Sequence, residues 1–141
     1  MASKRSIRVG DLIIGGGAPV VIQSMTNTDT RDVEATSAQI RRLYEAGCQL
    51  ARVSVYDTRC AQAVRELVDR SPIPLVADIH FDHRLAIQSV ENGIQKLRIN
   101  PGNIGGADRV RSLVACAKEH GVPIRIGVNG GSLEPDLLRK Y

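Results

Sequence analysis

Charged side chains stand inside four short apolar runs of this sequence. They are Arg52 in "ARVSV", Asp78 in "ADIHF", Arg98 in "LRINP" and Arg125 in "IRIGVN". Aligned on their apolar cores, the four runs place these residues at the same point. Crowded guanidinium groups without matching carboxylates favour an external anion, and a diphosphate matches them in charge and geometry. The pattern therefore predicts a diphosphate-binding site.

Further polar side chains follow the same runs. His80 comes two residues after Asp78, and Asn100 comes two residues after Arg98. Asn129 ends the last run. Side chains two residues apart in a strand share a face. These residues are therefore expected to line the same site. No residue of the set is assigned a catalytic role.

A structural ion-pair network is the alternative interpretation. Arg52 and Arg98 could simply pair with Asp78. Three arginines stand against one carboxylate, however, and that imbalance favours anion binding.

Composition and charge narrow the function classes. The net charge is +4, but the basic residues are scattered, and aromatic residues make up only 3% of the chain. A single-strand nucleic-acid binder needs aromatic stacking platforms, so no nucleic-acid partner is expected. No apolar run is long enough to cross a membrane, so no membrane association is expected either.

The three cysteines form no metal or redox motif. Cys48, Cys60 and Cys116 contain no C-x-x-C pair, and we interpret them as buried reduced thiols. No metal site is expected in this chain. The odd cysteine count and the absence of a signal sequence predict a cytoplasmic protein.

Strand patterns alternate with helix patterns along the chain. The strand runs are "APVVIQSM", "CQLARVSV", "PIPLVADIHF", "IQKLRIN" and "VPIRIGVN", and amphipathic stretches at helical spacing separate them. Such alternation predicts a parallel sheet covered by helices. The carboxyl ends of parallel strands form the binding face of these folds, which would bring the charged residues together.

The fold class is α/β, and we predict an incomplete TIM (β/α)8 barrel of about five βα units. An open doubly wound sheet is the alternative, but no G-x-G-x-x-G follows the first strand. The opening "IRVGDLIIGG" alternates and breaks at Gly10, which predicts an N-terminal β-hairpin. A complete barrel needs eight strands and about 250 residues. Residues 1–141 are therefore expected to be the N-terminal portion of a longer barrel domain.

Five strings of the sequence carry a family resemblance. "APVVIQSMTNTDTRD", "AGCQLARVSV", "PLVADIHFDHRLA", "KLRINPGNIG" and "RIGVNGGSLE" resemble the 4-hydroxy-3-methylbut-2-enyl diphosphate synthase family, of the IspG type. Together they span nearly the whole chain. One departure is Gly130, where the family usually has alanine.

The resemblance implies a function in non-mevalonate isoprenoid biosynthesis. Such oxidoreductases reductively open 2-C-methyl-D-erythritol 2,4-cyclodiphosphate, using a 4Fe-4S cluster and electrons from flavodoxin or ferredoxin. They act as homodimers with a C-terminal iron–sulfur domain, which is absent from this chain together with the cluster ligands. No cofactor is therefore expected on these 141 residues, which we predict to be inactive alone.

The resemblance also assigns the site residues. Arg52, Arg98 and Arg125 resemble the family's diphosphate-binding arginines, and Asn100 and Asn129 its substrate-contacting asparagines. Asp78 and His80 resemble polar residues that line the same mouth.

Two other functions compete with this interpretation. One is a transferase barrel of the dihydropteroate synthase type, which carries no cluster. The other is a non-catalytic remnant that has kept only the anion site.

Overall fold

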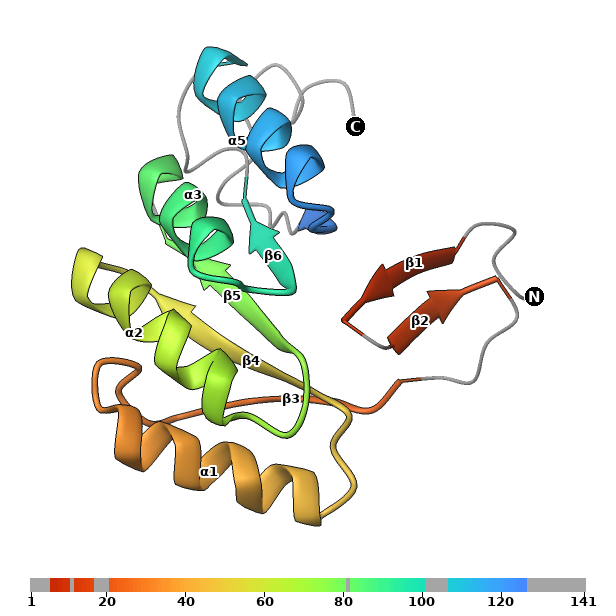
Figure 1. Cartoon of the computed structure of the whole chain (residues 1–141), viewed down its shortest axis with the longest axis vertical. Helices are drawn as coiled ribbons and strands as arrows, with labels where there is room; N and C mark the ends of the chain where they lie inside the picture. The colour runs from red at the N-terminus through yellow and green to blue at the C-terminus, as the bar shows by residue number, and fades with distance from the viewer. Residues whose placement is uncertain (1–5, 11, 17–20, 81, 101–106, 127–141) are drawn as a thin grey trace, which may run out of the picture.

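The computed structural model describes residues 6–10, 12–16, 21–80, 82–100 and 107–126 of the 141-residue chain. Its elements, in chain order (Figure 1), are β1 (Ser6–Val9), β2 (Leu12–Gly15), β3 (Gln23–Met25), α1 (Val33–Glu45), β4 (Leu50–Val55), α2 (Thr58–Arg70), β5 (Leu75–Ile79), α3 (His83–Glu91), β6 (Lys96–Ile99), α5 (Ala107–Glu119) and β7 (Ile124–Ile126).

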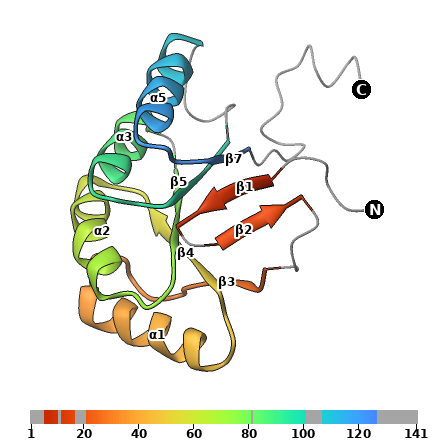
Figure 2. The same cartoon turned by 45° about the vertical axis from the view of Figure 1, so that its right-hand side comes forward.

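Five strands form one parallel sheet in the order β3-β4-β5-β6-β7. The sheet order repeats the chain order, as in a barrel wall built from successive βα units. The helices α1, α2, α3 and α5 lie on one side of this sheet in both views (Figure 1 and Figure 2). The predicted fold class, an incomplete (β/α)8 barrel with about five βα units, is confirmed.

Alternating residues of the strands face different partners. Val53, Ala77 and Leu97 are fully buried and belong to the core between the sheet and the helices. The residues between them, such as Arg52 and Arg98, face the other side, because successive side chains of a strand point to opposite faces. The charged residues therefore lie on the face of the sheet that the helices do not cover.

The predicted N-terminal hairpin is present. β1 and β2 pair antiparallel, and Val9 packs against Leu50 and Val76 on the inner face of the sheet. Gly10, in the turn, has φ +56°, and a Cβ there would lie 2.9 Å from Cγ of Pro74. Glycine is thus required both by the left-handed backbone and by close approach to the loop before β5. The hairpin therefore covers the inner face near the amino ends of β4 and β5.

Aspartate residues begin three of the helices. Asp32, Asp57 and Asp82 are the N-caps of α1, α2 and α3, and each accepts a hydrogen bond from a backbone N–H of the first turn. Such caps satisfy donors that have no partner within the helix. They fix the βα loops at the carboxyl edge of the sheet, where the candidate site lies. Among the described residues, no helix has the length and apolar character needed to cross a membrane.

Candidate functional site

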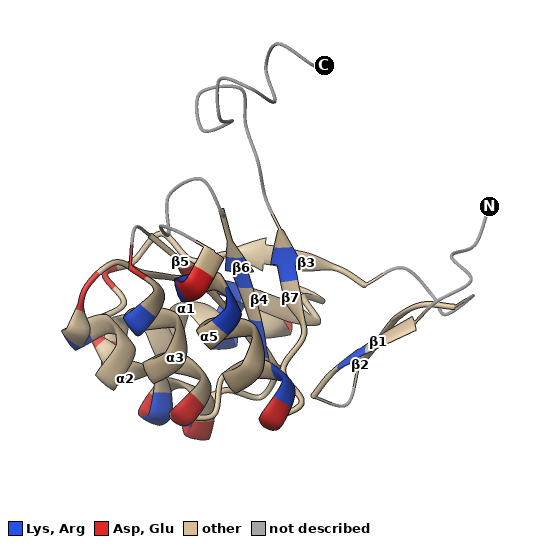
Figure 3. Cartoon of the chain, turned by 90° about the horizontal axis from the view of Figure 1, so that it is seen from above, with Lys and Arg blue, Asp and Glu red and all other residues tan. Residues whose placement is uncertain are grey.

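Three of the predicted residues form a line across neighbouring strands. Asp78 on β5 is the register partner of Arg98 on β6, and Arg98 is the register partner of Arg125 on β7. Nη1 of Arg98 donates a hydrogen bond to Oδ1 of Asp78 over 3.1 Å. Figure 3 shows the basic bands of β6 and β7 beside each other in the sheet. The sequence alignment is confirmed for these three positions.

The same alignment is wrong for Arg52. Its register partner on β5 is Val76, and Ser54 is the residue opposite Asp78. Arg52 thus lies two residues earlier along the sheet than predicted. Apolar patterns fix which face a side chain occupies, but they do not fix the stagger between neighbouring strands. A shift of two residues preserves the face, so Nε of Arg52 still lies 3.6 Å from Oδ2 of Asp78.

The guanidinium of Arg52 is only partly satisfied. Nη2 donates to the sulfur of Met25 over 3.1 Å, a weak acceptor. Nε is buried and has no hydrogen-bond partner among the described residues. A buried donor without a partner is costly. An anion that reached this side chain would therefore add a hydrogen bond that the described residues do not supply.

The remaining predicted residues lie close to this line or outside the described residues. Nε2 of His80 lies 3.9 Å from Oδ2 of Asp78. Asn100 directly follows β6 and is buried, with 5% of its surface exposed. Asn129 lies outside the described residues, so its prediction stays untested. The structure thus brings His80 to the carboxylate and places Asn100 at the carboxyl end of its strand.

Lys96 is a basic residue that the sequence analysis missed. It lies two residues before Arg98 on β6, on the same face, and is only 7% exposed. Burial and, to a smaller extent, the charge of Arg125 lower the pKa of this lysine. The period of two along the strand was the signal that could have identified it.

The charges of the inner face are strongly unbalanced. Within the described part of these strands, Asp78 is the one carboxylate on the face that carries Arg52, Arg98, Arg125 and Lys96, and it contacts Arg52 and Arg98. Its side chain is 5% exposed, whereas those of Arg52 and Arg98 are 24% and 27% exposed. The carboxylate lies deeper than the guanidinium groups, which keep donors available to an incoming group. This arrangement suits an oxyanion with several acceptor oxygens.

The cysteines do not fit a metal cluster. Cys48 is buried and its Sγ donates to the carbonyl of Leu50 over 3.0 Å, while Cys60 is fully buried on α2 and burial raises its pKa. Cys116 on α5 is only partly buried, so the prediction of a buried thiol is wrong for this residue. Cluster ligation requires thiolates that converge on one point. Among the described residues, which include all three cysteines, no group of three or more histidine, cysteine or acidic side chains could hold a metal ion.

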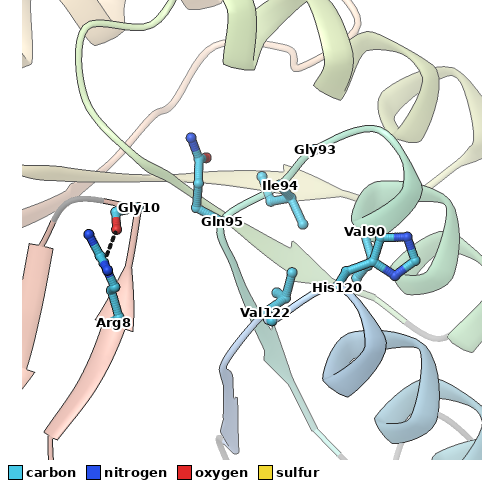
Figure 4. A pocket seen from close by; sticks show the side chains of 9 residues that line it. Arg8, Gly10, Val90, Gly93, Ile94, Gln95, His120 and Val122 are labelled. Atoms are coloured by element: carbon cyan, nitrogen blue, oxygen red, sulfur yellow. Dashed lines mark hydrogen bonds between the residues drawn. The ribbon is translucent and has the colours of Figure 1, made fainter.

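A separate cavity of about 360 Å³ lies at the amino ends of β6 and β7, away from the charged line. Arg8, Gln95 and His120 are among its lining residues (Figure 4). Nε of Arg8 already donates to the carbonyl of Gly10 over 3.1 Å. The cavity lies beside the C-terminal ends of α3 and α5, where the helix dipole disfavours anions. It is therefore not a second phosphate site.

One family model matches almost the whole chain. Residues 4–141 match the GcpE TIM-barrel domain. The chain is also similar to two curated proteins, each named 4-hydroxy-3-methylbut-2-en-1-yl diphosphate synthase (flavodoxin). The relative from Desulfotalea psychrophila is 58% identical over 139 residues, which are 99% of this chain and 38% of the relative. The relative from Geobacillus kaustophilus is 61% identical over 137 residues, 97% of this chain and 37% of the relative. The chain therefore spans less than two fifths of their length.

Solved structures with low sequence identity share the fold. Dihydropteroate synthase from Yersinia pestis superposes with a TM-score of 0.66 at 15% identity, over 98% of this chain and 53% of that protein. Phospho-2-dehydro-3-deoxyheptonate aldolase from Thermotoga maritima gives a TM-score of 0.58 at 18% identity, over 89% of this chain and 39% of that protein. At such identities the likeness shows the barrel fold alone, and it adds no support to the transferase alternative.

Proposed function

This chain belongs to the GcpE TIM-barrel domain family, and from that premise we propose that it forms the diphosphate-binding part of a 4-hydroxy-3-methylbut-2-en-1-yl diphosphate synthase. The parent reaction would be the reductive opening of 2-C-methyl-D-erythritol 2,4-cyclodiphosphate in non-mevalonate isoprenoid biosynthesis. The proposal draws on relatives at 58% and 61% identity that carry this synthase name.

The observation that carries the proposal is the excess of guanidinium groups around one carboxylate. Asp78 holds Arg98 by a hydrogen bond and Arg52 by an ion pair, and Arg125 is the register neighbour of Arg98. In the proposal, the arginines bind and neutralise the diphosphate, and Asp78 orients two of them. Neutralising a leaving oxyanion in a fixed polar site is a major contribution to catalysis.

We assign the other predicted residues to substrate contact. Asn100 and Asn129 would donate amide hydrogens to the bound ligand, and His80 would line the mouth beside Asp78. The position of Asn100 at the end of β6 and the 3.9 Å between His80 and Asp78 support this assignment.

The redox chemistry would come from outside this chain. A 4Fe-4S cluster would supply the electrons, and the cysteines of this chain do not fit its ligation, so we assign them no part in it. Flavodoxin is the electron donor that the names of the relatives give, and ferredoxin is the alternative. We further propose that the whole enzyme is a homodimer and works in the cytoplasm; the free thiols support a reducing compartment.

Calorimetric titration tests the proposal. The chain should bind 2-C-methyl-D-erythritol 2,4-cyclodiphosphate and, more weakly, inorganic pyrophosphate, with affinity falling as salt rises. Arg98→Met should lower the affinity for both ligands at least tenfold, because it removes about one charged hydrogen bond to the ligand. Arg111→Met, which changes an exposed arginine on α5, should leave both affinities unchanged.

Three outcomes separate the proposal from its alternatives. Absence of binding at low salt would reject the anion site. Preference for a pterin diphosphate over the cyclic diphosphate would favour the transferase type. Reductive turnover by the isolated chain would contradict the assignment of electron transfer to another part of the enzyme.

A further inference from the structure

Two loops at the carboxyl edge of the sheet are joined by one network of side chains. The loop between β3 and α1 contributes Asp29 and Arg31, and the loop between β4 and α2 contributes Tyr56 and Asp57. The phenol of Tyr56 donates to Oδ1 of Asp29 over 3.0 Å, across a separation of 27 residues. We call these four residues the rim network. None of these four residues belongs to the diphosphate site described above.

Asp29 is the centre of the rim network. Its carboxylate accepts hydrogen bonds from the backbone N–H of Arg31 over 3.0 Å and from Nη2 of Arg31 over 2.7 Å. The guanidinium of Arg31 lies 5.4 Å from the ring centroid of Tyr56, and its Nη1 lies 3.5 Å from Oδ2 of Asp57. Each loop is therefore held to the other by a hydrogen bond, a cation–π contact and an ion pair.

Side chains of helix α1 also hold the loop between β3 and α1. Oε1 of Gln39 accepts from the backbone N–H groups of Asn27 and Thr28 over 2.9 and 3.2 Å, and its Nε2 donates to Oδ1 of Asn27 over 2.6 Å. The hydroxyl of Thr36, which is fully buried, donates to the carbonyl of Asp29 over 2.7 Å. Asn27, Thr28 and Asp29 are thus held by side chains of α1, which reduces the freedom of the loop.

The protonation states suit this network over a wide pH range. Hydrogen bonds from Arg31, in the first place that from its side chain, hold the pKa of Asp29 well below its usual range. Tyr56 is 43% exposed, and its partial desolvation, followed by the bond to Asp29, raises its pKa to about 12. At neutral pH, Asp29 is therefore a charged acceptor and Tyr56 a neutral donor.

The first residue of the β3–α1 loop is hydrogen-bonded to the backbone of Arg52. The N–H and hydroxyl of Thr26 both donate to the carbonyl of Arg52, over 2.9 and 3.3 Å. The preceding residue, Met25, accepts from the guanidinium of Arg52. A displacement of the loop would therefore move one partner of the Arg52 backbone and disturb Met25, one partner of its head group.

We propose that Asp29 and Tyr56 are positioning residues: by locking the β3–α1 loop to the β4–α2 loop, they hold Arg52 ready for a phosphate-bearing ligand. This inference rests on the proposed function for the identity of the ligand. A site that is ordered before binding loses less conformational entropy when the ligand arrives. Neither residue needs to touch the ligand for this effect.

Two measurements on the whole chain test the lock. Tyr56→Phe removes the bond to Asp29 and keeps the ring beside Arg31. Hydrogen exchange followed by NMR should become faster at the amides of Asn27, Thr28 and Arg31. The affinity for inorganic pyrophosphate should fall about three- to tenfold, the range expected for one hydrogen bond. Asp29→Asn should give the same signature, and Arg98→Met should weaken binding without changing exchange at these amides.

Matched controls separate the lock from a general loss of stability. Tyr44→Phe changes a tyrosine on α1 that is 48% exposed, and Glu34→Gln removes one negative charge from the first turn of the same helix. Both should leave exchange and affinity unchanged. The double variant Asp29→Asn/Tyr56→Phe should lose little more affinity than the weaker-binding single variant, because both changes break one bridge.

Unchanged amide exchange in Tyr56→Phe would overturn the proposal, whether or not pyrophosphate binds. Faster exchange with wild-type affinity would also overturn it, because the loops would then be locked without consequence for binding. If the wild-type chain binds no pyrophosphate, the proposed function fails, and the positioning role toward Arg52 fails with it, even if the exchange data show a bridge between the loops.

Discussion

Asp78 and Arg98 are register partners on neighbouring strands, and Arg98 donates to Asp78 over 3.1 Å. The carboxylate is 5% exposed and the guanidinium 27% exposed. A guanidinium has five N–H donors, so one bond to Asp78 can fix the group and leave donors for a ligand. The pair therefore fixes Arg98 and leaves donors of its guanidinium for the anion that we propose it binds.

Asp78→Asn should destabilise the chain by about 2 kcal/mol, because Arg52 and Arg98 then lack a carboxylate in a partly buried site. Urea denaturation measures the loss. Added pyrophosphate should recover part of it, since an anion that binds the folded state stabilises that state.

Asp69→Asn is the control for this experiment, because Asp69 is exposed on α2. It should change the free energy of unfolding by less than about 0.5 kcal/mol. Equal stability of Asp78→Asn and the wild-type chain would mean that Asp78 does not balance these arginines.

Leu97→Ala should destabilise the chain by about 3 kcal/mol, because it leaves a cavity between β6 and the helices. Leu97 is fully buried in the core. Thermal and urea unfolding should both report the loss. Val114→Ala, at a side chain that is 46% exposed on α5, should cost less than about 1 kcal/mol. Similar losses of stability for the two variants would contradict the assignment of Leu97 to the core.

Local signals account for the part of the fold that the sequence predicted. Gly10 marks the hairpin turn because its backbone is left-handed and close to Pro74. Asp32, Asp57 and Asp82 are local signals of the same kind, since each caps a backbone N–H within three residues of its own position. Such signals are readable because the interacting groups are neighbours in sequence.

Relationships between distant residues account for what the sequence did not predict. The alignment of Arg52 with Asp78 was off by two residues because strand stagger depends on packing across the whole sheet. The bond from Tyr56 to Asp29 joins residues 27 positions apart, and no local sequence signal links the two. The face of each residue and the pairing of Arg52 and Arg98 with Asp78 could thus be predicted. The stagger of β4 against β5 and the bond between Tyr56 and Asp29 could not.

Anaerobic reconstitution with ferrous iron and sulfide should load no 4Fe-4S cluster on this chain. The buried thiols of Cys48 and Cys60 are held in the core, and the raised pKa of Cys60 disfavours the thiolate that ligation needs. Bound iron and acid-labile sulfide, measured after desalting, should both stay at background. The triple variant Cys48→Ala/Cys60→Ala/Cys116→Ala is the control. A cluster present in the wild-type chain and absent from this variant would contradict the assignment of the thiols as structural.

Lys96→Met should stabilise the chain at pH 7 by about 1 kcal/mol, because it replaces a buried cation by an apolar side chain of similar length. Lys96 is 7% exposed, and burial together with Arg125 lowers its pKa. The unfolded chain, with a lysine pKa of about 10, then holds this proton more tightly than the folded chain. The wild type should gain stability as pH rises from the folded pKa toward about 10, so its difference from the variant should narrow there. Urea midpoints across that pH range measure this, with Lys118→Met, exposed on α5, as the control. A variant less stable than the wild type at pH 7 would mean that the charge of Lys96 is satisfied in the folded chain.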